Sequence, residues 1–258
     1  MIHGPLEPPL QGLSKQEIRR LVWRRLVEAG VARPPFPVEG RIPNFAGAER
    51  AAERIAGLEE WRRARVLKVN PDSPQRPVRL RALREGKLVL MATPRIRKGF
   101  LLLDPSRIPS SQLSRASTIR GAFRYGLPLP TVSSLLRVVE KVDMIVEGSV
   151  AVSIYGDRLG KGHGYGDLEY GILTSLGLAG DKTPIATSVH DLQVFKQRLP
   201  QDPHDVPVDI IATPTRLVRA EEARRRRPRG IIWSVLDDRK IAEIPLLREL
   251  REVAGRDG

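Results

Sequence analysis

The amino-acid sequence predicts an α/β fold with a mostly parallel sheet flanked by helices. Short runs of branched apolar residues alternate along most of the chain with segments whose apolar residues recur at helical spacing. An unbroken apolar run over residues 144–154 is typical of a strand buried on both faces, as parallel strands are. Neither an internal repeat nor a domain boundary stands out. We therefore expect a single domain over residues 1–258, with an N-terminal helical extension behind a loose segment at 1–13.

The helix and strand signals follow one another along the chain. Ser14 is a good N-cap and Glu17 stands at the capping-box position, so a helix should begin here and stop near Gly30. Further helices are expected over residues 46–63, from the 70–74 turn to Gly86, and over 131–140, 168–176 and 237–253. Residues 221–227 are expected to form a charged helix or turn. Strands are expected over residues 66–69, 88–92, 99–103, 184–189, 208–212 and 230–235.

The composition of the chain limits which kinds of site and location it can have. The 258 residues contain no cysteine, which excludes disulfides and thiolate metal sites. No apolar run approaches the roughly 18 residues of a membrane span, so we expect a cytoplasmic protein without a membrane segment. The net charge of +14 favours polyanions or a small anionic substrate, or is simply a solvated basic surface. Abundant arginine and 22 prolines hint at a heat-adapted source.

The apolar run leads into a glycine-rich loop and then a helical segment. Five glycines lie in the loop, which also carries Arg158 and Lys161: Gly156, Gly160, Gly162, Gly164 and Gly166. A strand, a glycine loop and a helix start together present backbone N–H groups to an anion. The loop lacks the Walker pattern, and its alternative interpretation is a tight strand-to-helix turn. Our leading hypothesis is a phosphate-binding loop for a nucleotide.

Other polar positions have two interpretations each. Asp167 is either the N-cap of the helix or a ligand for a Mg²⁺ that rides on nucleotide phosphates. The spacing of His163, His190 and His204 matches no zinc pattern, so we interpret them as loop histidines rather than a metal triad. The basic run at residues 224–229 is interpreted as a solvated face, with nucleic-acid binding as the alternative.

Three blocks of sequence carry a resemblance to a known family. They are Val142-Asp-Met-Ile-Val-Glu-Gly-Ser-Val-Ala-Val152, Arg158-Leu-Gly-Lys-Gly-His-Gly-Tyr-Gly-Asp167 and Leu199-Pro-Gln-Asp-Pro-His-Asp-Val-Pro-Val-Asp-Ile-Ile-Ala-Thr213. In order and spacing they resemble the 5-formyltetrahydrofolate cyclo-ligase family, also called methenyltetrahydrofolate synthetase. Lys15-Gln-Glu-Ile-Arg19 is similar to the N-terminal Lys-x-x-Leu-Arg element of that family. Residues 40–45, 68–72 and 92–97 look more like a divergent branch described as synthetase domain-containing.

The resemblance implies a fold like that of the ribose-5-phosphate isomerase and CoA-transferase group, with Mg-ATP and a reduced folate as ligands. In the family reaction the formyl oxygen on N5 attacks the γ-phosphate of ATP, N10 then closes the ring, and phosphate leaves. Carried over by position, Arg158, Lys161 and Tyr165 are the catalytic candidates and Asp167 is the Mg²⁺ ligand. The implied phosphate- and nucleotide-binding residues are Lys15, Arg19, Gly160, Gly162, His163, Gly164 and Gly166.

The glycine loop departs from the family pattern Gly-x-Gly-Gly-Gly-Tyr-Tyr-Asp-Arg at three positions. His163 replaces a glycine, Gly166 replaces the second tyrosine and Leu168 replaces the arginine, which removes a bidentate anion contact. Asp104 is the nearest candidate for the folate-side carboxylate of the family. We expect an ATP-dependent cyclo-ligase-like enzyme. The alternatives are a paralogue that keeps a nucleotide or folate pocket without this chemistry, and a basic nucleic-acid-binding protein.

Overall fold

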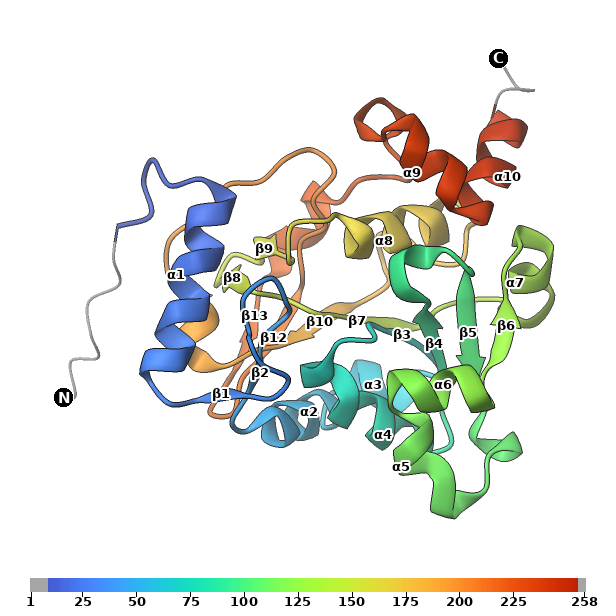
Figure 1. Cartoon of the computed structure of the whole chain (residues 1–258), viewed down its shortest axis with the longest axis horizontal. Helices are drawn as coiled ribbons and strands as arrows, with labels where there is room; N and C mark the ends of the chain where they lie inside the picture. The colour runs from blue at the N-terminus through green and yellow to red at the C-terminus, as the bar shows by residue number, and fades with distance from the viewer. Residues whose placement is uncertain (1–8, 255–258) are drawn as a thin grey trace.

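The structure, a computed structural model, describes residues 9–254 and confirms the predicted α/β class. Its centre is an eight-stranded sheet in the order β13-β12-β10-β7-β3-β4-β5-β6 (Figure 1). The five inner strands are parallel: β12 (Ile210–Ala212), β10 (Ile185–Ser188), β7 (Met144–Glu147), β3 (Val66–Val69) and β4 (Leu88–Ala92). Antiparallel strands close both edges: β13 (Leu217–Arg219) on one side and β5 (Phe100–Leu103) and β6 (Leu127–Leu129) on the other.

Helices cover both faces of this sheet, because alternate residues of each strand are apolar on each side. In Figure 1, the lower face packs against α2 (Ala48–Ala56), α3 (Glu59–Arg63), α4 (Arg76–Arg84), α5 (Leu113–Ala116) and α6 (Ile119–Tyr125). The upper face packs against α7 (Val132–Val138), α8 (Tyr165–Ser175), α9 (Asp238–Glu243) and α10 (Pro245–Ala254). Along β3, Leu67 and Val69 belong to the lower core, so Lys68 between them projects toward α8.

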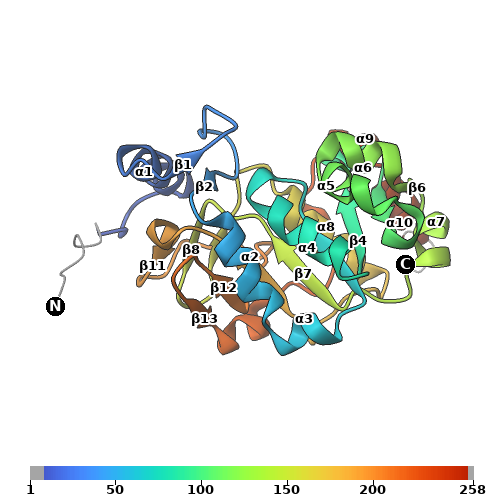
Figure 2. The ribbon, with the colours of Figure 1, turned by 90° about the horizontal axis from the view of Figure 1, so that it is seen from below.

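A smaller sheet and a helix stand at one end of the large sheet (Figure 2). This sheet joins β11 (Val194–Phe195), β8 (Ala151–Ser153) and β9 (Arg158–Leu159), and a hairpin of β1 (Ala32–Arg33) and β2 (Asn44–Phe45) lies nearby. Helix α1 (Lys15–Glu28) packs on the small sheet through Ile18, Val22 and Leu26, so the predicted extension shares a core with it. The expected capping box of Ser14 and Glu17 is present.

The predicted loose segment at residues 1–13 lies largely outside the described residues. In the described part, Leu10 is buried and its N–H donates to Gln197 Oε1 at 3.0 Å.

The long apolar run at residues 144–154 is not one strand, as predicted, but two. Strand β7 ends at Glu147 and β8 begins at Ala151 in the other sheet. The chain turns at Gly148, where a Cβ atom would lie 3.0 Å from Gln75 Oε1 and 3.1 Å from Ile42. These two side chains leave little space for a larger residue at position 148, where the chain passes from one sheet to the other.

Several other element predictions were also wrong in detail. The helix expected over residues 46–63 breaks between α2 and α3 at Gly57, and the closing helix breaks before Pro245, since proline cannot continue the hydrogen-bond ladder. Residues 230–235 form no strand; they are a loop with a 3₁₀ turn at Trp233–Val235. The short strands β11 and β13 and the helices α5 and α6 were not predicted.

The basic run is largely engaged within the molecule. Arg227 has a fully buried side chain and pairs with Asp209, while Arg226 pairs with Asp157 at 2.6 Å. Arg224 also reaches Asp209, at 3.2 Å. These cations pair with buried carboxylates, so the interpretation as a solvated face was wrong for the buried Arg227, whereas Arg224 and Arg226 stay partly exposed. None of the helices within residues 9–254 is long and apolar enough to cross a membrane.

Candidate active site

A cavity of about 470 Å³ opens at the carboxyl edge of the large sheet. In the sheet, β4 pairs with one edge of β3 and β7 pairs with its other edge. The strand order therefore reverses between β3 and β7. Open α/β sheets bind ligands at such reversals, outside the carboxyl ends of the strands. The loops after β3, β4 and β7 contribute Asp72, Arg95 and Gly148 to the wall, and the glycine loop closes it from the side of α8.

The glycine loop presents an open helix terminus to this cavity. Gly164, with a φ of 71°, is the N-cap of α8, and Gly162 also has a positive φ. The free N–H groups of the first turn therefore lie at the cavity wall, where they suit an anion. Arg19 supports the loop from behind, because its Nε donates to the Gly160 carbonyl at 2.7 Å and its guanidinium carbon would lie 3.4 Å from a Cβ on Gly162.

Most of the residues expected in the site line the cavity. Those that do are Arg158, Gly160, Lys161, His163, Gly164, Tyr165, Gly166 and Asp167. Lys161 forms an ion pair with Asp72, with 3.0 Å between Nζ and Oδ1, and the His163 ring stacks on Tyr165. Burial, aided by the charges of Lys161 and Arg95, lowers the pKa of His163.

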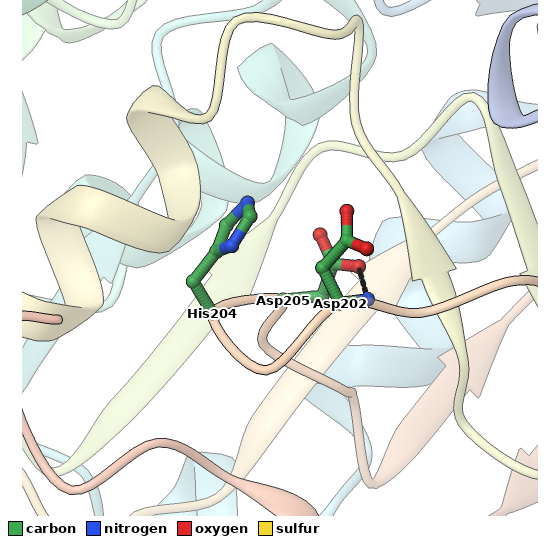
Figure 3. Close-up of side chains that lie close together, drawn as sticks. All are labelled: Asp202, His204 and Asp205. Carbon is green, nitrogen blue, oxygen red and sulfur yellow. Dashed lines mark hydrogen bonds between the residues drawn. The ribbon is translucent and has the colours of Figure 1, made fainter. Parts of the chain in front are cut away.

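Lys15, Arg19 and Gly162 are not among the lining residues. Lys15 instead pairs with Asp202, at 2.6 Å, and with Asp205. Figure 3 shows these carboxylates beside His204; among the described side chains, the three form the only group of three or more His, Asp or Glu ligands close enough to share a metal ion. The Lys15 ammonium already contacts both carboxylates, so it occupies the place that a metal ion would take between them. His163 and His190 lie elsewhere, which fits the interpretation of the three as separate loop histidines.

Asp167 is not the helix cap. It lies within the first turn of α8, where its Oδ1 accepts hydrogen bonds from Arg158 and, at 2.9 Å, from the Val206 N–H. Arg158 also donates to the carbonyls of Val206 and Gly148. Burial alone would lower the pKa of Arg158, but the carboxylates of Asp167, Glu147 and Asp205 together outweigh it, so the net pKa is raised. The guanidinium therefore fixes Asp167 at the cavity wall.

Beneath the glycine loop lies a buried charge network that the sequence interpretation missed. Lys68 is fully buried and contacts Glu147 on β7, the Asn70 side chain at 3.1 Å and Glu169 on α8 at 2.6 Å. Burial raises the pKa of Glu169 to about 7, with Lys68 opposing the shift and Glu147 adding to it. Glu169 also lines the cavity.

The signal for this network was present in the sequence. Lys68 and Glu147 are charged residues within otherwise apolar strands, a pattern that seldom occurs without a partner. The expected folate-side carboxylate Asp104 was misplaced: it caps the turn at Ser106 and is not among the cavity-lining residues. The acidic side chains that line the cavity are Asp72, Asp167 and Glu169.

Fold and site together define an α/β protein with a cavity at the carboxyl edge of its sheet, beneath a glycine loop that ends in an open helix N-terminus. The chain belongs to the 5-formyltetrahydrofolate cyclo-ligase family, whose model matches residues 12–214. It is 41% identical over 256 residues to a methenyltetrahydrofolate synthase domain-containing protein of Bos taurus and 39% identical over 259 residues to that of Homo sapiens. These alignments cover 96% and 98% of this chain and 66% of each relative, so the chain spans just under two thirds of their length.

Two solved structures are similar to this one in outline. An NMR structure of Aquifex aeolicus 5,10-methenyltetrahydrofolate synthetase gives a TM-score of 0.49 at 21% identity and covers 81% of this chain and 94% of that one. A 5,10-methenyltetrahydrofolate synthetase from Mycoplasma pneumoniae gives a TM-score of 0.45 at 11% identity and covers 81% and 100%.

Proposed function

We propose that this protein binds Mg-ATP and a reduced folate in the cavity and converts 5-formyltetrahydrofolate to 5,10-methenyltetrahydrofolate. Membership of the cyclo-ligase family supports this reaction. The observation that carries the proposal is the open N-terminus of α8, which forms one wall of the cavity at the strand-order reversal. The cytoplasmic location and the heat-adapted source stay predictions from composition.

The cavity residues divide into groups that bind and groups that position. The N–H groups after Gly164 and the Lys161 ammonium hold the phosphates, since Lys161 is about a third exposed and reaches across the cavity. Arg158 donates to two carbonyls and to Asp167, so it orients Asp167 rather than contacting the phosphates directly. Phosphoryl transfer depends on this kind of positioning and charge neutralisation.

The donor set of the cavity fits Mg²⁺. Asp72 and Asp167 both line it, and each uses Oδ1 for a cation on the protein, Lys161 or Arg158. Mg²⁺ typically takes one or two carboxylates and keeps several waters, so these two side chains suffice. When bound, the ion neutralises charge on the phosphates.

The reaction is tested by incubating the protein with Mg-ATP and 5-formyltetrahydrofolate. We expect the methenyl product to appear as near-ultraviolet absorbance, over a range of temperatures that includes elevated ones. If no product forms at any temperature, the reaction is wrong. Calorimetric binding of both ligands without turnover would then identify a paralogue that keeps the pocket. The replacement of the family arginine by Leu168 is the observation that favours this second candidate.

Asp167→Asn should weaken ATP binding in the presence of Mg²⁺ and leave metal-free ATP binding nearly unchanged. The amide is a poorer metal ligand than the carboxylate, and it also weakens the contact with Arg158. We expect a loss of about tenfold or more for Mg-ATP, the effect of losing one charged contact. Calorimetry with and without Mg²⁺ measures it. Equal losses in both conditions would show that Asp167 acts only through the fold.

A further inference from the structure

The turn after β4 holds a backbone conformation that its residues disfavour. Arg95 and Ile96 have φ angles of 56° and 57°, in the left-handed region that branched and long side chains rarely adopt. The turn is held closed by Thr93, whose hydroxyl donates to the Gly99 carbonyl at 2.9 Å and accepts from the Lys98 N–H at 3.0 Å. Ile96 is fully buried and anchors it. Backbone strain of this kind gathers at binding sites.

Arg95 lies at the cavity wall with its hydrogen-bonding capacity unused. It makes no hydrogen bond or ion pair with any residue in the range 9–254, whereas the other cations of the wall are engaged. Arg41 donates to the Pro37 carbonyl, Arg158 pairs with Asp167, and Lys161 pairs with Asp72. The charge of Arg95 also acts on His163, which places the guanidinium near the glycine loop.

We propose that Arg95 binds an oxyanion of the substrates, from the β4 turn beside the glycine loop. A guanidinium offers a planar pair of donors that matches a phosphate or a carboxylate. Leu168, at the position of the family arginine, packs in the apolar core and is not among the cavity-lining residues, so Arg95 offers a guanidinium from a different element, the β4 turn. The identity of the anion rests on the proposed function: it is either the terminal phosphate of ATP or the glutamate carboxylate of the folate.

The strained turn makes the proposal testable with one substitution. Arg95→Gly relieves the left-handed backbone, because glycine adopts positive φ without steric cost, and at the same time it removes the guanidinium. A residue kept only for stability would lower the melting temperature when replaced. We expect the opposite combination for Arg95→Gly: a melting temperature equal to or above that of the wild type, and ligand binding weakened by about 10- to 100-fold.

Calorimetric titrations with Mg-ATP, Mg-ADP, 5-formyltetrahydrofolate and a 5-formyl tetrahydropterin without the glutamate tail identify the anion. A loss for Mg-ATP but not Mg-ADP assigns the terminal phosphate. A loss for the folate but not for the tailless pterin assigns the carboxylate. Arg95→Lys, which keeps the charge without the planar donors, should fall between the wild type and Arg95→Gly.

Arg97→Ala is the control, because Arg97 lies on the same turn, pairs with Glu243 and is not among the cavity-lining residues. Equal losses in Arg95→Gly and Arg97→Ala would reveal a general field effect and overturn the assignment. So would affinities within twofold of the wild type for every ligand. A wild-type protein that binds neither nucleotide nor folate refutes the proposed function, and the role of Arg95 with it.

Discussion

Lys68→Met should lower the free energy of unfolding by about 3–5 kcal/mol, the cost of leaving buried charges without their partner. The methionine fills a similar length of space but cannot neutralise Glu147 and Glu169, whose side chains are at most 5% exposed. Urea unfolding measures the loss. Lys141→Met is the matched control: Lys141 is 70% exposed and lies 3.8 Å from Asp143, so its replacement should cost less than about 1 kcal/mol.

The cost of Lys68→Met should depend on pH in a definite direction. The pKa of Glu169 is raised from 4.5 to about 7 in the folded protein, so its contribution to stability is fully present below pH 4.5 and is lost as pH rises to about 7. Without the lysine, the pKa of Glu169 should rise further, so protonation at low pH should restore more stability to the variant than to the wild type. The deficit should therefore be smaller at pH 5 than at pH 8. A deficit equal at both values would contradict this account of the network.

The inner sheet could be predicted from local patterns because its strands are short apolar runs bounded by turns. Strands β3, β4, β10 and β12 lie within a residue or two of their predicted positions. The run at residues 144–154 could not be divided in this way, since both parts are fully buried and the turn at Gly148 depends on distant Ile42 and Gln75. Residues 230–235 are apolar because they form part of a second layer that covers α8, and not because they pair with a strand.

The glycine loop could be located from the sequence because its residues are contiguous. Much of the remaining cavity wall follows the ends of three strands, so Asp72, Arg95 and Gly148 come together only once the strand order is known. The family resemblance assigned Lys15 to the phosphates, whereas in the structure Lys15 pairs with Asp202 and Asp205, which lie far along the chain. Long-range ion pairs of this kind leave no local signal.

Gly166→Ala should destabilise the protein, although the same change in most helices is stabilising. In a helix interior, alanine is favoured over glycine by about 0.8–1.0 kcal/mol. Here a Cβ atom would lie 2.8 Å from Glu147 Oε2 and 3.6 Å from the Arg158 guanidinium. Glu147 is fully buried and held by Lys68, so it cannot move aside. We expect a net loss of about 1–3 kcal/mol, as overpacking costs, together with weaker ATP binding at the displaced loop.

Gly180→Ala is the control, because a Cβ atom there would meet nothing within 4 Å, and it should change stability little. The cause is isolated by a double variant. If the clash with Glu147 is responsible, Gly166→Ala should cost much less in a Glu147→Ala background than in the wild type, which a double-mutant cycle measures. An equal cost in both backgrounds would place the effect elsewhere in the loop.

This coupling explains why the loop departs from its family at residue 166. A tyrosine there, as in the family pattern, would bring a Cβ atom to within 2.8 Å of Glu147 Oε2 before its ring is placed. The glycine at 166 and the glutamate at 147 are therefore structurally coupled, and Lys68 pairs with the glutamate. Gly166→Tyr should accordingly unfold more readily than Gly166→Ala, and restoring the family residue alone should reduce rather than improve activity. Higher activity in Gly166→Tyr would show that the buried network is incidental to the loop.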